Sequence, residues 1–275
     1  MIEDAVIYYQ GAPGAFSEAA ILSHWPYAHP TGCASFAETF QAILEKPDGI
    51  GLLPIENAYR GPVYDVLDLL TASPLSIWAE AVQPVELVLM AHGHSDLARI
   101  RTVRSHPQAL MQSQVFCRQH GLAAEVALDT AGSAREVAEL ERDDIGAIAS
   151  PRAAEIYGLN VVRRGIQDHP DNRTRFWLLS RRPISLLSPL HRTKTSMVFD
   201  LPDKPGALVD YLMWYKKLGL NLSKVESRPR PGSPFAYRFW IDVVGDAERV
   251  DQAWENGLPS LEWGKRLGTY PVLSE

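Results

Sequence analysis

Short apolar runs alternate with helix-like segments along the first 180 residues, and this alternation constrains the fold more than any other feature. Because strand, loop and helix repeat, we expect a mainly parallel sheet covered on both faces, with ligands beyond the carboxyl ends of the strands. The expected strands lie at 5–9, 49–54, 85–90, 102–105 and 145–149. The expected helices lie at 16–24, 36–44, 108–120, 133–141 and 153–157.

The pattern changes after residue 180. The segment RRPISLLSPLHRTK, residues 181–194, carries two prolines and four Lys or Arg residues, and it predicts a linker. Beyond it we expect the βαββαβ order of a ferredoxin-like module, which at about 80 residues is large enough to be a small domain. These elements are expected at 195–200, 207–218, 221–227, 236–244, 248–256 and 269–273.

Composition argues against several classes of function. The chain of 275 residues is 46% apolar and 22% charged, as in an ordinary globular protein, and its net charge of −6 argues against a general nucleic-acid or anionic-membrane binder. No apolar run approaches the roughly 20 residues of a membrane span, and the first residues do not predict a secretory signal. Cys33 and Cys117 are the only cysteines, which excludes a disulfide framework and fits a reducing cytoplasm. We therefore expect a cytoplasmic protein without nucleic-acid or membrane partners.

The absence of familiar catalytic motifs narrows the chemistry. Neither HExxH, GxSxG nor a Cys/His cluster at metal spacing occurs, so metal-dependent hydrolysis and acyl transfer by an activated serine have little support. Hydrogen bonds and local positive charge remain as the means of catalysis.

Polar loops follow several of the expected strands. In YQGAPGAFSEAA, residues 9–20, Gly11 and Gly14 allow a tight turn, and the helix that follows presents free N–H groups to an anion. Alternatively, Ser17 and Glu18 only begin that helix. In PIENAYRGPV, residues 54–63, Glu56 and Asn57 stand at the end of a strand, where they predict either ligand contacts or a helix cap and salt bridge.

Two more loops repeat this arrangement. In SHPQAL, residues 105–110, Ser105 suits a helix cap, while His106 and Gln108 can donate to a ligand oxygen. In DTAGSA, residues 129–134, Thr130 holds a similar place. Since the carboxyl ends of parallel strands meet at one edge, we expect these loops to line one cleft.

The segment HPDNRTRFWLLS, residues 169–180, places polar side chains in front of an apolar run. Asn172 offers two donors, Thr174 a hydroxyl, Arg175 a planar cation suited to carboxylates, and Phe176 an apolar ring. This combination suits an anionic organic acid. Alternatively, the segment is a polar turn before an edge strand with solvated arginines.

Taken together, these segments resemble prephenate dehydratases over nearly the whole chain. The matching motifs are GAPGAFSEAA, PIENAYRGPV, SHPQAL, DTAGSA, IASPRAAEIYGL and NRTRF, followed by GALV at 206–209 and ESRP at 226–229. Ala58 stands where a serine is commoner, Ser113 where a cysteine is common, and Arg173 at a variable position.

The resemblance implies a two-lobed α/β catalytic domain similar to periplasmic binding proteins, followed by an ACT regulatory domain. The catalytic domain is expected at 1–182, with one lobe at about 1–78 plus 160–182 and the other at about 79–159. The linker is expected at 183–193, and the ACT domain at 194–275.

The resemblance also implies a reaction and its residues. Prephenate loses carbon dioxide and its ring hydroxyl to give phenylpyruvate, and no cofactor or metal is required. By this match Thr174 donates toward the leaving hydroxyl, Arg175 anchors a carboxylate, and Phe176 packs beside the ring. The other implied substrate-binding residues are Asn57, Glu56, Ser105, His106, Gln108, Thr130 and Asn172.

For the ACT domain the resemblance implies a site for L-phenylalanine at a dimer interface, as an allosteric effector in a homodimer or tetramer. Gly206 would let backbone N–H groups approach the carboxylate of the amino acid. The implied effector residues are Gly206, Ala207, Leu208, Val209, Asn221, Glu226, Ser227, Arg228 and Pro229. Two alternatives stay open: an arogenate dehydratase, and a non-catalytic amino-acid sensor.

Overall fold

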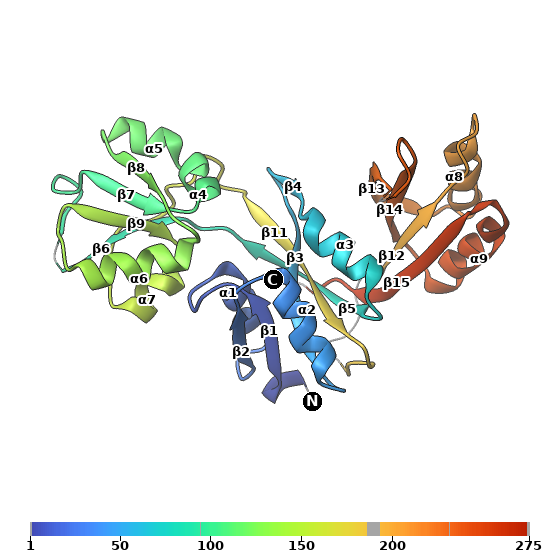
Figure 1. Cartoon of the computed structure of the whole chain (residues 1–275), viewed down its shortest axis with the longest axis horizontal. Helices are drawn as coiled ribbons and strands as arrows, with labels where there is room; N and C mark the ends of the chain where they lie inside the picture. Colours follow the sequence, from blue (N-terminus) through green and yellow to red (C-terminus); the bar gives the residue numbers. More distant parts are fainter. Residues whose placement is uncertain (1, 94, 186–192, 231, 274–275) are drawn as a thin grey trace.

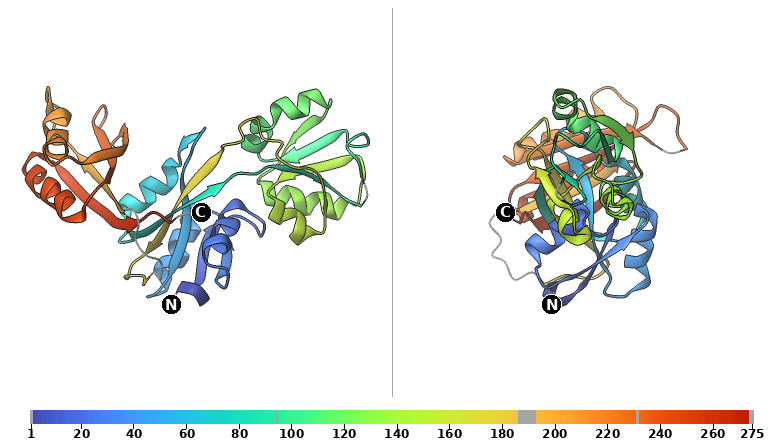
Figure 2. Two further views of the ribbon diagram at one scale, coloured as in Figure 1. Left: turned by 180° about the vertical axis from the view of Figure 1, so that it is seen from behind. Right: turned by 90° about the vertical axis from the view of Figure 1, so that its left-hand side faces the viewer.

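The computed structural model of the chain describes residues 2–93, 95–185, 193–230 and 232–273, and it arranges them around three sheets. A second lobe and a C-terminal module lie at opposite ends of an elongated molecule, and a first lobe lies between them (Figure 1). The view from behind shows the same order (Figure 2).

The first lobe is a mixed sheet with strand order β2-β1-β3-β11-β5, and the short strand β4 pairs with β3. Strands β1, β2 and β3 are parallel, whereas β11 runs antiparallel to both β3 and β5. The elements of this lobe are η1 (Ile2–Asp4), β1 (Val6–Gln10), α1 (Phe16–His24), β2 (His29–Cys33), α2 (Phe36–Glu45), β3 (Ile50–Asn57), β4 (Gly61–Pro62), α3 (Tyr64–Ala72), β5 (Ser76–Pro84) and β11 (Arg173–Ser180).

The second lobe is a five-stranded sheet with order β10-β6-β9-β7-β8. Strands β7, β8 and β9 are parallel, and β6 is antiparallel to β9 and β10. Its elements are β6 (Val88–Ala91), β7 (Thr102–Ser105), α4 (Pro107–Gln112), α5 (Gln114–Gln119), β8 (Ala123–Val126), α6 (Thr130–Leu140), β9 (Ile145–Ala149), α7 (Pro151–Tyr157) and β10 (Asn160–Arg163).

The C-terminal module has the expected βαββαβ order. Its sheet, in the order β13-β14-β12-β15, is antiparallel throughout. Its elements are β12 (Thr193–Asp200), α8 (Ala207–Lys217), β13 (Asn221–Pro229), β14 (Tyr237–Val244), α9 (Ala247–Gly257), η2 (Leu258–Ser260) and β15 (Trp263–Pro271). The α/β fold with two lobes and a ferredoxin-like module is therefore confirmed.

The expectation of mainly parallel sheets is wrong in a specific place. Strand β5 leads from the first lobe into the second and β11 returns, so the two strands pair antiparallel beside each other. The pattern also missed the strands β2, β4, β5, β8 and β10 and the helix α3, and it treated 108–120 as one helix. That helix breaks at Ser113, whose backbone leaves helical angles and whose hydroxyl donates to the carbonyl of Ala109 at 2.8 Å.

Sheet membership moves the expected lobe boundaries. Strand β5 stays in the first sheet until Pro84, beyond the expected boundary at 78. Strand β10, expected in the first lobe, pairs with β6 of the second. Of the expected linker 183–193, residues 186–192 lie outside the described ranges and Thr193 already begins β12. The division into a catalytic and a regulatory domain stays a prediction.

The C-terminal module shares a hydrophobic core with the first lobe. Trp177 of β11 packs edge-on against Tyr270 of β15 with ring centroids 6.3 Å apart, and both rings are buried. Gly268 allows β15 to approach the backbone of Ile77 on β5, where a side chain would collide with the Ile77 carbonyl. The module is thus packed onto the sheet that carries β11.

Candidate functional site

A cleft of about 1010 Å³ lies between the first and second lobes. The first lobe lines it with Gln10, Gly11, Ala15, Phe16, Ser17, Ala34, Ser35, Phe36, Ala37, Pro54, Asn57, Val63, Asp65, Asp68, Leu69, Thr174 and Phe176. The second lobe and the crossover that leads into it contribute Val85, Leu87, His106, Gln108, Ala109, Gln112, Leu128, Asp129 and Thr130. Of the ten predicted catalytic and substrate-binding residues, six line this cleft: Asn57, His106, Gln108, Thr130, Thr174 and Phe176.

A bulge in β3 determines which side chains face the cleft. On β3, Glu56 pairs with Arg175 and Pro54 with Phe176, so Ile55 is an extra residue. Proline has no N–H for the ladder, which explains a bulge at this position. Since side chains alternate along a strand, Thr174 and Phe176 face the cleft and Arg175 faces the opposite side.

Asn57 and Thr174 form a cross-strand pair at the cleft wall. The Oδ1 atom of Asn57 accepts hydrogen bonds from the N–H groups of Tyr59 and Arg60, at 3.1 and 3.2 Å. These two bonds orient the amide so that Nδ2 points to the Thr174 hydroxyl, 3.1 Å away. The Thr174 oxygen accepts this bond, and the described residues offer no acceptor to its hydrogen, which can therefore donate to a ligand in the cleft.

Asn172 supports this pair from behind and does not line the cleft. Its Oδ1 accepts from Asn57 Nδ2 at 2.8 Å, and its Nδ2 donates to Gln112 Oε1 at 3.0 Å. Gln112 belongs to the second lobe and lines the cleft. The buried Asn172 amide thus connects the two walls, so its predicted contact with substrate becomes a supporting contact.

Ser105 and His106 have different positions from those expected. Ser105 is fully buried and donates to the carbonyl of Ile148 at 2.5 Å, so it holds β7 against β9 instead of contacting a ligand. The cap of α4 is His106, whose Nδ1 accepts from the N–H of Gln108 at 3.2 Å. Because Nδ1 accepts, the proton of a neutral His106 ring resides on Nε2, which can donate to a ligand.

Several helices begin at the cleft wall. Helix α1 starts without a side-chain cap, so its first N–H groups have no partner within the helix. Ser35 caps α2 and Asp129 caps α6, each accepting from an N–H three residues later. The first-turn residues that line the cleft are Phe16, Ser17, Phe36, Ala37, Asp65, Gln108, Ala109 and Thr130. Backbone N–H groups and helix dipoles therefore supply partial positive charge here.

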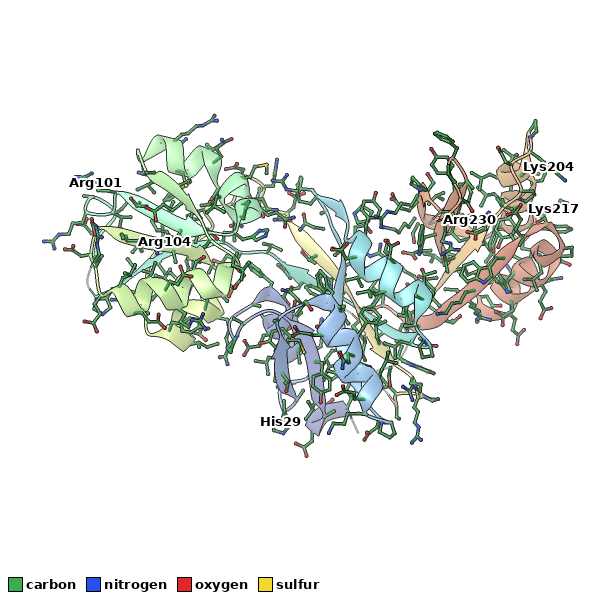
Figure 3. All side chains as sticks on the ribbon, viewed as in Figure 1. His29, Arg101, Arg104, Lys204, Lys217 and Arg230 are labelled. Carbon is green, nitrogen blue, oxygen red and sulfur yellow. The ribbon has the colours of Figure 1, made fainter. Side chains whose placement is uncertain are left out.

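Formal positive charge is absent from the cleft wall in the part of the chain that the structure describes. The charged residues that line it are Asp65, Asp68 and Asp129. Labelled basic residues such as Arg101, Arg104, Lys204, Lys217 and Arg230 lie within the second lobe or the C-terminal module, away from the region between the lobes (Figure 3). The sequence predicted local positive charge at the site. In the described cleft wall, backbone N–H groups provide it in place of a Lys or Arg side chain.

The predicted role of Arg175 as a carboxylate anchor in the cleft is wrong. Glu56, which was also predicted to bind the substrate, does not line the cleft either. The guanidinium lies on the far side of β11 and contacts Glu56 at 2.5 Å, Glu80 at 2.6 Å and Asp242 at 2.6 Å. Burial by itself would lower the pKa of Arg175, but the charges of Asp242 and Glu80 raise the pKa above its ordinary value. The alternation of β11 decided this, because a residue beside Thr174 cannot share its face.

The predicted effector residues lie on two elements of the C-terminal module, α8 and β13. Gly206 caps α8, and Ala207, Leu208 and Val209 form its first turn. On β13, Glu226 accepts from Tyr64 Oη at 2.7 Å and Arg228 donates to Asp68 at 2.6 Å, so both side chains point to α3 of the first lobe. The remaining predicted residues, Asn221, Ser227 and Pro229, are exposed.

Sequence reasoning missed the wall formed by α2 and α3. The start of α2 has a recognisable signal: Ser35 accepts from the N–H of Glu38, and the Glu38 side chain accepts from the N–H of Ala34, as in a capping box. Asp65 and Asp68 carry no such signal, because only the packing of α3 brings them to the cleft.

Within the described ranges, no group of three or more His, Cys, Asp or Glu side chains is placed to hold a metal ion. No helix in the described ranges is both long enough and apolar enough to cross a membrane.

Known proteins are similar to this chain in sequence and in fold. A family model described as prephenate dehydratase matches residues 7–184. The chain is 37% identical over 279 residues to arogenate dehydratase/prephenate dehydratase 2 of Arabidopsis thaliana, across 97% of this chain and 72% of that protein. It is 36% identical over 273 residues to a bifunctional N-acyl-homoserine lactone acylase/prephenate dehydratase of Komagataeibacter europaeus, across 98% and 96%. The solved prephenate dehydratase of Arthrobacter aurescens, in complex with L-Phe, superimposes with a TM-score of 0.86 at 31% identity, across 98% and 93%.

Proposed function

Because the chain belongs to the prephenate dehydratase family, we propose that its cleft converts prephenate to phenylpyruvate, carbon dioxide and water. In this reaction the bond to the ring carboxylate breaks, its electrons enter the ring, and the ring hydroxyl leaves as hydroxide. The hydroxide must take up a proton or accept a strong hydrogen bond as it departs. The observation that carries the proposal is the Thr174 hydroxyl, oriented by Asn57 and free to donate into the cleft.

The assigned role of Thr174 is to stabilise negative charge on the departing oxygen. A threonine hydroxyl is a very weak acid, so it acts here as a hydrogen-bond donor that strengthens as the oxygen becomes anionic. The bond that Thr174 accepts from Asn57 makes its own hydrogen a better donor. The stabilisation therefore grows toward the transition state, as catalysis requires.

The absence of cationic side chains from the described cleft wall fits the decarboxylation. A guanidinium bound to the departing carboxylate would stabilise the substrate more than the transition state. Backbone N–H groups at the starts of α1, α2 and α6 can hold the carboxylate that remains without a full charge. Phe176, which lines the cleft, offers an apolar ring to pack against the ring of the substrate.

Arogenate is a second candidate substrate, and one observation favours it. Asp65 lines the cleft, and the ammonium group of arogenate would find a carboxylate partner there, whereas the carboxylate of Asp68 is already paired with Arg228. The Arabidopsis relative is named for both activities. Turnover of each substrate by the purified protein decides between them.

We also propose that the C-terminal module is an ACT domain that binds L-phenylalanine as a feedback inhibitor in a homodimer or tetramer. Its βαββαβ sheet and the exposed edge of β13 support this assignment, as does the bound L-Phe of the Arthrobacter aurescens neighbour. Inhibition requires that phenylalanine bind more tightly to a state with a less competent cleft. Equal phenylalanine affinity with and without a substrate analogue contradicts this regulation.

The test compares Thr174→Val, which keeps the shape of the side chain, with Thr174→Ser, which keeps the hydroxyl. We expect Thr174→Val to lower kcat by about 100-fold or more with little change in KM, since a positioned donor typically contributes on the order of 10²–10⁴. Thr174→Ser should retain most of the activity. The assay follows phenylpyruvate from prephenate and phenylalanine from arogenate. Near-normal turnover by Thr174→Val refutes the role of the hydroxyl, and no turnover by the wild type with either substrate refutes the proposed function.

A further inference from the structure

Six ionic side chains meet where the C-terminal module packs on the first lobe. The first lobe supplies one cation and two carboxylates, and the module supplies two cations and one carboxylate. The members of this interface cluster are Arg175, Glu56 and Glu80 of the first lobe and Lys194, Lys224 and Asp242 of the module. The first lobe therefore contributes a net negative charge and the C-terminal module a net positive charge. The cluster becomes neutral only when the two are in contact.

Arg175 is the centre of the interface cluster. Its Nη1 donates to Glu56 at 2.5 Å, and its Nη2 donates both to Glu80 at 2.6 Å and to Asp242 at 2.6 Å. Charged hydrogen bonds of this kind are strong and directional, particularly when the partners are removed from water. The side chains of Glu80 and Asp242 are only 1% and 2% exposed.

Asp242 is itself held firmly by the module. Its Oδ1 accepts from Ser196 Oγ at 2.5 Å, and Ser196 faces it across the β12–β14 ladder. Lys194 of β12 reaches the second oxygen of Glu80 at 2.6 Å. A buried carboxylate with a fixed second partner cannot follow Arg175 if β11 moves, so it acts as a rigid stop.

Two residues of the interface cluster are chain neighbours of the cleft pair. Arg175 follows Thr174 on β11, and Glu56 precedes Asn57 on β3. The cross-strand ion pair on one face of the two strands therefore lies directly behind the cross-strand hydrogen bond on the other face. Rotation or sliding of either strand end would break both contacts together.

We infer that Asp242 is a positioning residue for the reaction: acting through Arg175, it holds the Thr174–Asn57 pair in its reactive geometry. The inference rests on the proposed function of the cleft and adds to it a requirement for the C-terminal module. A misplacement of a reacting group by about 1 Å can cost on the order of 10²-fold in rate, so a clamp of this kind affects kcat more than binding.

The decisive variant is Asp242→Asn, which preserves shape and removes the charge. Its matched control is Asp200→Asn. Asp200 is an equally buried aspartate of the same module. Its ionic partners, Arg238 at 2.8 Å and Arg230 at 3.6 Å, belong to the module and not to β11. We expect Asp242→Asn to lower kcat about tenfold or more with KM within about twofold, whereas Asp200→Asn destabilises the module with kcat within about twofold. Ser196→Ala, a milder change, should lower kcat in the same direction.

A second measurement does not depend on activity. Hydrogen exchange of peptides covering residues 173–177 should quicken in Asp242→Asn and in Ser196→Ala but not in Asp200→Asn. Equal effects of the Asp242 and Asp200 variants on kcat and on exchange overturn the inference. If Asp242→Asn does not fold, unchanged kcat and exchange in Ser196→Ala overturn it. If the wild type turns over neither substrate, the proposed function fails, while the exchange comparison still tests the clamp.

Discussion

Gly14 lies at a contact between the two lobes that a single methyl group should disrupt. Its φ is +91°, and a Cβ added there would lie 2.8 Å from Ala153 Cα and 2.9 Å from Ala153 Cβ at the start of α7. The same contact includes a hydrogen bond from Ser150 Oγ to the Gly14 carbonyl at 2.6 Å and one from Tyr157 Oη to the Pro13 carbonyl at 3.0 Å. Gly14→Ala therefore acts on a contact that joins the two lobes.

The magnitude follows from two separate costs. A left-handed φ costs a residue with a Cβ about 1–2 kcal/mol, and this part is the same wherever such a glycine occurs. Overpacking against Ala153 costs a further ~1–3 kcal/mol, which the protein can relieve by opening the cleft. If opening relieves the collision, this second cost appears as weaker substrate binding, a rise in KM of about 5- to 150-fold.

Gly121→Ala is the matched control. Gly121 also has positive φ, +64°, but nothing lies within 4 Å of its added Cβ. We expect both variants to lose similar thermal stability and only Gly14→Ala to raise KM in steady-state assays. Equal KM values for the two variants would show that the lobes do not close through Gly14.

Two further predictions concern charge. The pKa values of Glu56 and Glu80 both lie below the ordinary glutamate value of 4.5. Burial by itself would raise both pKa values, but Lys224 and Arg175 lower that of Glu56, and Arg175 and Lys194 lower that of Glu80. Because the folded pKa values are depressed, the stability that these carboxylates contribute is present above pH 4.5 and is lost as pH falls through the folded pKa values. The free energy of unfolding, measured with urea between about pH 3 and pH 6, should therefore decrease toward the acidic end. A free energy of unfolding that does not change with pH would contradict this prediction. Arg228→Gln should weaken inhibition by phenylalanine, measured as a higher half-inhibiting concentration, with kcat within about twofold because this half-exposed pair contributes little stability. Unchanged inhibition would show that the Arg228 contact with α3 does not carry the signal.

Much of the site was accessible from local sequence. Helix α1 was predicted at its observed bounds, and His106, Gln108 and Thr130 follow strand ends and begin helices, as the polar loops indicated. The resemblance to prephenate dehydratases, based on motifs in the same order, is confirmed. These features depend on residues close in the chain, where capping and apolar periodicity operate.

Strand register was harder to predict, and it accounts for the main error. PIEN was expected after a strand but lies within β3, where Pro54 produces a bulge. The sequence predicted at most an edge strand at β11. It did not indicate that Thr174 would point into the cleft and Arg175 to the C-terminal module. The central position of β11 between β3 and β5 settled their directions.

The sequence by itself determined most of the helices, the polar loops around the cleft and the family, because each depends on patterns within about a dozen residues. Only the tertiary structure decided that Asn57 orients Thr174 and that Arg175 joins Glu80 and Asp242 in a buried cluster. It also decided that Asp65 and Asp68 reach the cleft. The physical reason is that these contacts join residues far apart in the chain, and their geometry follows from register, a bulge and the packing of the module on the first lobe.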